Sequence, residues 1–217
     1  LVSGSLVARM RIPPFIATLG MMLVLKGMSL IVTGTKPIYF NDTPGFTTIA
    51  QGSLIGQIVP AFPVPNGVLV LFIVAGAAAW TLGRTVLGRY TFALGSNEEA
   101  VRLSGVNTDF WKIAIYTLSG AICGIAGLLI ASRLNSAQPA LGLGYELEAI
   151  AAVVIGGTSL SGGRGTILGT LIGALIMSVL TNGLRVLSVA PEWQTVVTGV
   201  IIIFAVYADQ MRRRGKA

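Results

Sequence analysis

Six long runs of apolar residues limit what this chain can fold into. They cover residues 11–34, 67–84, 111–133, 146–157, 166–184 and 193–210. A helix needs about 20 residues to cross the hydrocarbon core of a bilayer, and most of these runs approach that length. The run at 146–157 is shorter, and we expect it to cross only part of the bilayer or to enter it at a tilt. The sequence therefore predicts six membrane segments.

The composition indicates a chain that is dissolved in lipid along its whole length. Hydrophobic residues make up 53% of the sequence and charged residues 11%, with a mean hydropathy of +0.81. Too little polar surface remains to cover a globule that faces water on every side. We predict an all-α polytopic membrane protein in which residues 1–217 form a single transmembrane domain. Residues 1–8 read like the end of an earlier apolar segment, so we expect an N-terminally truncated chain.

The positions of Lys and Arg predict the topology, because basic side chains near span ends are retained on the cytoplasmic side. If residue 11 starts inside, only Lys36, Arg133 and Arg185 fall outside. The inside set is Arg9, Arg11, Arg84, Arg89, Arg102, Lys112, Arg164, Arg212, Arg213, Arg214 and Lys216. This sorting supports six segments and a cytoplasmic C-terminus. It also accounts for the net charge of +7 without a nucleic-acid partner, because the basic residues lie where apolar runs stop.

The sequence lacks histidine, the residue that general-base catalysis and metal binding most often use. It contains no His and a single cysteine, Cys123. The commonest general base and metal ligand are therefore absent, and no intrachain disulfide can form. No Ser, Thr or Cys nucleophile has a His to activate it. We expect a chain that is not an enzyme and that holds no cofactor and no metal.

The glycine-rich stretch IGGTSLSGGRGT, residues 155–166, invites comparison with a phosphate-binding loop. Gly157 and Gly162 have the separation that such a loop requires. However, Gly163 and Arg164 stand where the loop needs its Lys and its hydroxyl residue. We interpret the stretch as a tight cytoplasmic turn, so any energy source must come from another chain.

Two series of small residues predict helix-packing faces, because close backbone approach is the main packing device of helices in lipid. Both series have a spacing of four: Gly165, Gly169 and Gly173, and Ser119, Cys123, Gly127 and Ala131. For Cys123 a packing role is favoured over a redox role, since a thiol in an apolar span forms a poor thiolate.

Polar residues gather on the predicted outer side, between the third and fourth apolar runs. They are Asn135, Gln138, Tyr145, Glu146 and Glu148. Two interpretations fit them equally well: the entrance of a pathway for a hydroxylated solute, and a polar interfacial loop. The other long outer connection, residues 35–66, carries Pro37, Pro44, Pro60, Pro63 and Pro65, which prevent a continuous helix. It fits either a contact for a delivering partner or a plain connector.

The predicted cytoplasmic loop at 84–111 contains a polar segment, SNEEAVRLSG, with strong helix signals. Ser96 followed by Glu99 predicts a capping box, and Glu98 and Glu99 suit the first turn. Gly105 can take the left-handed conformation that ends a helix. We predict a rigid helix of about two turns. Because isolated helices this short are marginal in water, we expect it to need a docking surface.

Several stretches together resemble one family across nearly the whole chain. They are RIPPFIATLGMM, GRYTFALGSNEEAVRLSGV, GYELEAIAAVVIGGTSLSGGRGT and the NGL segment before Trp193. The family comprises the permease subunits of bacterial ATP-binding-cassette (ABC) sugar importers of the ribose and xylose type, within a group that includes branched-chain amino-acid permeases. The resemblance implies about ten spans in two inverted halves, similar to the vitamin B12 importer permease. This chain would hold roughly the last six.

The resemblance also implies partners and a coupling site. The coupling helix that docks on an ABC ATPase subunit would contain Gly95, Ser96, Asn97, Glu98, Glu99, Ala100, Arg102, Leu103 and Gly105. A periplasmic sugar-binding protein would deliver a monosaccharide, and a second permease chain, identical or related, would complete the pair in the bacterial inner membrane. The alternatives are a membrane scaffold that transports nothing, a permease for another small solute, and a carrier driven by an ion gradient. The last is weakened because no span carries a buried carboxylate suited to ion coupling.

Overall fold

The computed structural model describes residues 1–58 and 63–214. Pro60 and Lys216, which entered the sequence-based predictions, lie outside these ranges. The chain divides into two compact units, and each is assembled from two separate stretches. The first unit holds Leu1–Thr81 and Gly105–Leu141, and the second holds Leu82–Ser104 and Gly142–Ala217. The residues predicted to form a single transmembrane domain thus form two compact units.

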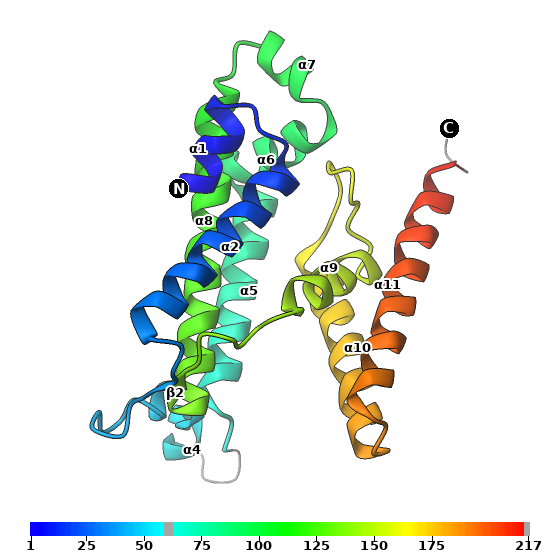
Figure 1. Ribbon diagram of the computed structural model, residues 1–217. Coiled ribbons are helices and arrows are strands. Elements are labelled where there is room, and N and C mark those ends of the chain that lie inside the picture. The colour runs from blue at the N-terminus through cyan, green and yellow to red at the C-terminus, as the bar shows by residue number, and fades with distance from the viewer. Residues whose placement is uncertain (59–62, 215–217) are drawn as a thin grey trace. The chain divides into compact units, whose positions relative to one another are not determined.

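The first unit contains one long helix, several shorter segments that pack on it and two further long helices (Figure 1). Its elements are α1 (Val2–Arg9), α2 (Pro14–Thr33), β1 (Ile38–Tyr39), α3 (Thr48–Gln51), α4 (Leu54–Ile58), most of α5 (Asn66–Arg84), α8 (Thr108–Leu134) and β2 (Ser136–Ala137). Helix α1 packs on the first half of α8, where Gly4 lets the backbones approach. A Cβ at Gly4 would lie 3.0 Å from the Cα of Ile113.

Local sequence signals set the ends of the long helices in this unit. Helix α2 starts at Pro14, where a missing N–H costs nothing, and it stops at Gly34, which has a left-handed φ of 58°. Helix α8 starts after Asn107, whose side chain accepts a hydrogen bond from the N–H of Phe110 at 3.0 Å. It ends at Asn135, which is also left-handed, with a φ of 50°.

The second unit contains a helical core and two shorter helices (Figure 1). Its elements are α6 (Val86–Ser96), α7 (Glu98–Leu103), α9 (Tyr145–Ile155), α10 (Ile167–Val186) and α11 (Pro191–Arg214). Helix α9 packs against both α10 and α11. Ala151, Ala152 and Met177 are buried between them, next to Ile201 and Ile202. Helix α6 differs from the sequence-based prediction, which gives residues 84–111 as a loop with one helix.

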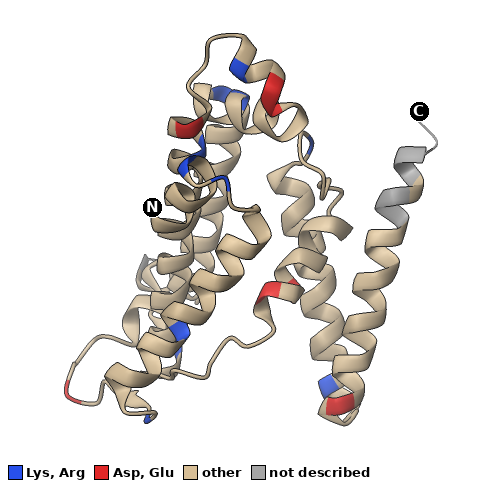
Figure 2. Cartoon of the chain, turned by 45° about the horizontal axis from the view of Figure 1, so that its top comes forward, with Lys and Arg blue, Asp and Glu red and all other residues tan. Residues whose placement is uncertain are grey.

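Each of the six predicted apolar runs forms a helix. Among the described residues, four of these helices, α2, α5, α8 and α10, are long and apolar enough to cross a membrane. Helix α9 has only 11 residues, as its short apolar run predicted, and α11 is apolar over Pro191–Tyr207. Figure 2 shows that the helices are largely free of charge along their length and that charged residues concentrate near helix ends and in loops. Apolar side chains on the long helices are exposed, which suits a lipid environment: Ile31 is 81% exposed. The chain is an all-α multi-pass membrane protein.

Candidate coupling site

Helix α7 is the segment that sequence reasoning singled out, and the structure corrects its cap. Ser96 is the last residue of α6 and does not cap α7. Asn97 is the N-cap instead, and its side-chain oxygen accepts a hydrogen bond from the N–H of Ala100 at 3.0 Å. The predicted Ser96–Glu99 capping box is therefore wrong by one residue. It failed because α6 runs through Ser96 and leaves Asn97 as the first residue with extended backbone.

The other end of α7 forms as predicted. Ser104 closes the helix, and its side chain donates a hydrogen bond to the carbonyl oxygen of Ala100 at 2.9 Å. Gly105 follows with a φ of +80°, a conformation that strongly favours glycine. Glu98 and Glu99 lie in the first turn, where they complement the positive end of the helix. The result is a helix of six residues, shorter than the two turns expected.

Most of α7 is exposed to its surroundings. All of the predicted coupling residues from Ser96 onward are exposed, and Leu103 is 81% exposed. Only Val101 is half-buried among the α7 residues. An apolar side chain beside two acids and an arginine forms a small mixed surface. Such a surface can dock a partner through one apolar contact with charged neighbours around it.

The α9–α10 loop, residues 156–166, lies against the end of α6. A Cβ placed on Gly95 would come within 2.7 Å of the backbone nitrogen of Gly163. A Cβ placed on Gly162 would come within 2.6 Å of the carbonyl oxygen of Gly95, and one on Gly163 would lie 3.1 Å from Cβ of Ser96. Two backbones therefore touch directly at a point where neither has a side chain. Sequence reasoning placed Gly95 in the coupling helix, whereas the structure places it in α6, half-buried at a contact that the sequence did not predict.

The α9–α10 loop is a tight turn, as predicted. The N–H of Ser159 donates to the carbonyl oxygen of Arg164 at 3.0 Å, and the N–H of Gly162 donates to that of Ser159 at 3.0 Å. Gly162 and Gly163 both have positive φ, at 85° and 75°. A cavity of about 250 Å³ lies beside this turn and the end of α6, lined in part by Thr91, Phe92, Thr158 and Thr170.

One of the two predicted packing faces has its partner in the second unit. A Cβ on Gly169 would overlap the carbonyl oxygen of Gly156, and a Cβ on Gly173 would overlap that of Ala152. Gly165 does not belong to this face, because α10 begins only at Ile167. Its near neighbour is Thr158, whose Cγ2 would lie 2.7 Å from an added Cβ.

The second predicted face, on α8, is exposed over most of its length, and only Ala131 of its four residues is half-buried. Ser119, Cys123 and Gly127 are exposed, and a Cβ on Gly127 would meet nothing within 4 Å. Its packing role stays a prediction.

The five predicted pathway residues divide between the two units. Asn135 ends α8, and its side chain donates to the side-chain oxygen of Asn41 at 3.1 Å. Gln138 donates to the hydroxyl of Ser136 at 3.3 Å. Tyr145, Glu146 and Glu148 lie in the first turn of α9, which belongs to the second unit. The two polar residues of the first unit have structural partners, and a shared pathway stays a prediction.

The α2–α5 loop, residues 34–65, is fastened to the end of α8 by hydrogen bonds that sequence reasoning missed. Ser132 is completely buried. Its hydroxyl accepts from the N–H of Ala50 at 3.0 Å and donates to the carbonyl oxygen of Phe46 at 2.7 Å. Strands β1 and β2 pair antiparallel close by, with Ile38 opposite Ala137. We call this arrangement the Ser132 anchor.

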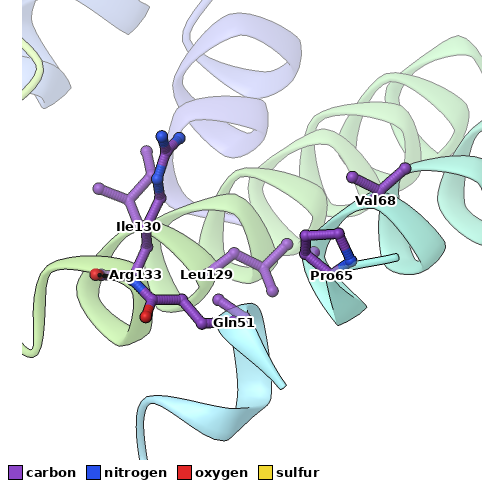
Figure 3. A pocket seen from close by; sticks show the side chains of 8 residues that line it. Gln51, Pro65, Val68, Leu129, Ile130 and Arg133 are labelled. Atoms are coloured by element: carbon purple, nitrogen blue, oxygen red, sulfur yellow. Dashed lines mark hydrogen bonds between the residues drawn. The ribbon is translucent and has the colours of Figure 1, made fainter. Parts of the chain in front are cut away.

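A cavity of about 450 Å³ lies beside the Ser132 anchor (Figure 3). Its lining is mostly apolar, with side chains of Pro65, Val68, Leu129 and Ile130. Gln51 closes one side, and its amide donates to the carbonyl oxygen of Arg133 at 2.8 Å. The guanidinium of Arg133 points away from Gln51 in this view.

Comparison with known proteins decides the family. The sequence pattern of the family described as branched-chain amino acid transport system / permease component matches residues 1–206. The chain belongs to this permease family. No solved structure matches the chain significantly.

Curated relatives of this chain are named as import permeases for sugars. The ribose import permease protein RbsC of Escherichia coli (strain K12) is 48% identical over 98% of this chain and 65% of its own length. RbsC of Bacillus subtilis (strain 168) is 44% identical over 97% and 63%. The fructose import permease protein FrcC of Rhizobium meliloti is 41% identical over 98% and 59%. The chain thus spans roughly three fifths of the length of these relatives, and the predicted resemblance to sugar import permeases is confirmed.

Proposed function

We propose that this chain is the transmembrane permease subunit of an ABC importer that carries a monosaccharide of the ribose or xylose kind across the bacterial inner membrane. The observation that carries the proposal is its 48% identity with a ribose import permease along almost its whole length. Four helices suited to span a bilayer support the membrane role. On this proposal the chain performs no covalent chemistry, and a separate ATPase subunit hydrolyses ATP.

Helix α7 is the proposed docking element for that ATPase. In the sequence it lies between α5 and α8, two helices long enough to span a membrane. The positive-inside rule predicts that this part of the chain faces the cytoplasm. Six residues form too short a helix to persist on caps alone. The exposed Leu103, together with Glu98, Glu99 and Arg102, offers the surface that a partner groove would cover.

The remaining assignments follow from the same proposal. A periplasmic sugar-binding protein delivers the solute, two permease chains pair, and the C-terminus lies in the cytoplasm. The complete permease has two inverted halves like the vitamin B12 importer permease. A different monosaccharide is the second candidate for the cargo, because relatives at 41% and 39% identity are named as fructose and as galactose/methyl galactoside import permeases.

Uptake by proteoliposomes that contain the assembled transporter tests the proposal. We expect accumulation of radiolabelled ribose or xylose that requires ATP, the ATPase subunit and the binding protein together. Uptake that persists without the ATPase would favour a carrier driven by an ion gradient. Absence of uptake for ribose, xylose, fructose and galactose, with all subunits present and correctly assembled, would favour a scaffold.

A further inference from the structure

Helices α6 and α7 are joined by hydrogen bonds of the residue between them. A single residue, Asn97, separates them, and it bonds to both. Its N–H donates to the carbonyl oxygen of Ala93 in α6 at 3.0 Å, and its side chain accepts from the N–H of Ala100 in α7 at 3.0 Å. A displacement of α7 therefore carries the end of α6 with it.

The end of α6 in turn contacts the α9–α10 loop through backbone atoms alone. Gly95 and Gly162–Gly163 leave no room for a Cβ on either side. Further along, Gly156 meets Gly169, and Ala152 meets Gly173, again at distances that exclude a Cβ. These contacts lie at the two ends of the α9–α10 loop, which the hydrogen bond between the N–H of Ser159 and the carbonyl oxygen of Arg164 closes. Together they form a line from α7 to the buried faces of α9 and α10, all inside the second unit. We call it the glycine line.

We propose that the glycine line transmits the displacement of α7 to the membrane helices α9 and α10 by moving as one rigid body. This inference rests on the proposed function, since it assumes that an ATPase displaces α7. Side chains can change rotamer and absorb a small displacement, whereas closely packed backbones have no such freedom and interiors are nearly incompressible. Helix α9 begins with Tyr145, Glu146 and Glu148, so a movement that reaches α9 also moves these polar residues.

The first test is a steric wedge in the assembled transporter. Gly95→Ala inserts a methyl group where Gly163 stands, and it requires no unusual φ because Gly95 is helical. Gly83→Ala is the matched control: Gly83 is also helical, and its added Cβ would meet nothing within 4 Å. We expect Gly95→Ala to keep its copurification with the ATPase but to lower ATP-driven sugar uptake about tenfold, a typical size for lost coupling between sites. Gly83→Ala should transport normally.

Uptake by Gly95→Ala equal to that of Gly83→Ala would overturn the proposal. The proposed function fails separately, because the unmodified transporter would then show no ATP-dependent uptake at all.

If Gly95→Ala does not fold, a disulfide across the same contact tests the rigid-body proposal instead. In a Cys123→Ala background, Ser96→Cys with Gly163→Cys places two Cβ atoms about 3.1 Å apart, somewhat closer than the roughly 3.5–4.5 Å of a relaxed disulfide. Gly163 has a φ of +75°, which a cysteine adopts only under strain, so the bond requires a small backbone shift. We expect mild oxidation to form the bond, detected by loss of thiol labelling relative to Ser96→Cys alone, and uptake to survive it. Uptake that stops on oxidation and returns on reduction would overturn the rigid-body proposal.

Discussion

Two loops of this chain are attached to helices in opposite ways. The α2–α5 loop is held to α8 by the Ser132 anchor, in which a buried hydroxyl satisfies one backbone donor and one backbone acceptor. The segment with α6 and α7 meets the α9–α10 loop at glycines, where the contact depends on atoms that are absent. One attachment is made by a side chain and the other by the lack of side chains.

The difference predicts opposite sensitivities to mutation. A hydrogen-bonded attachment fails when atoms are removed, because its buried partners are left unsatisfied. A backbone contact fails when atoms are added, because packed backbones cannot move aside cheaply. Hydrogen bonds to a buried hydroxyl suit a loop that holds one position, and direct backbone packing suits a segment that passes movement on.

Adding one methyl group at Gly173 should give the largest loss of stability. Its Cβ would overlap the carbonyl oxygen of Ala152, a backbone atom, so α9 and α10 must separate. We expect Gly173→Ala to lower the free energy of unfolding by about 3 kcal/mol, at the upper end of the usual overpacking cost. Gly183→Ala, in the same helix with nothing within 4 Å, should be neutral or slightly stabilising. Denaturant unfolding in detergent measures the free energy of unfolding of both variants. Equal stability for the two would contradict the expected cost of adding atoms at a backbone contact.

Removing the hydroxyl of Ser132 should give the next largest effect. Ser132→Ala leaves the N–H of Ala50 and the carbonyl of Phe46 without the partner that each now has. We expect a loss of about 2 kcal/mol, together with faster hydrogen exchange at Ala50. The control is Ser119→Ala, an exposed serine on the same helix. Unchanged exchange at Ala50 in Ser132→Ala would show that the anchor does not hold the loop.

Removing the cap of α7 should give the smallest effect. Asn97→Ala deletes the acceptor for the N–H of Ala100, and a lost N-cap costs about 1 kcal/mol. Hydrogen exchange at Ala100 should accelerate in this variant and stay unchanged in Ser96→Ala. The reverse result would restore the Ser96 capping box and contradict the structure.

The membrane helices were predictable because apolar length is a strong local signal. All six predicted segments form helices near their expected bounds, and even the short α9 was anticipated. The cap of α7 was missed by one residue, since Ser96 and Asn97 are both good N-cap residues and only the length of α6 decides between them. Helix α6 itself was missed, although Thr85 ahead of it is a recognisable cap whose hydroxyl accepts from the N–H of Gly88 at 3.3 Å.

Contacts between distant segments were less predictable. The spacing of Gly169 and Gly173 revealed a packing face but could not name Ala152 and Gly156 as its partners. Nothing local distinguishes Ser132 from the exposed Ser119 on the same helix, because its role depends on Phe46 and Ala50, more than 80 residues away. Composition and hydrophobic periodicity describe one helix or loop at a time, whereas these contacts depend on how distant segments pack together.

Copurification of this chain with the proposed ATPase subunit tests most directly whether α7 is the element from which the glycine line starts. The decisive variant carries Glu98→Lys, Glu99→Lys and Arg102→Glu together, and Asp42→Lys in the α2–α5 loop gives the same net charge change as a control. We expect the triple variant to insert in the membrane and to lose the ATPase, while Asp42→Lys and Gly95→Ala retain it. Undiminished copurification of the triple variant would contradict the coupling role of α7.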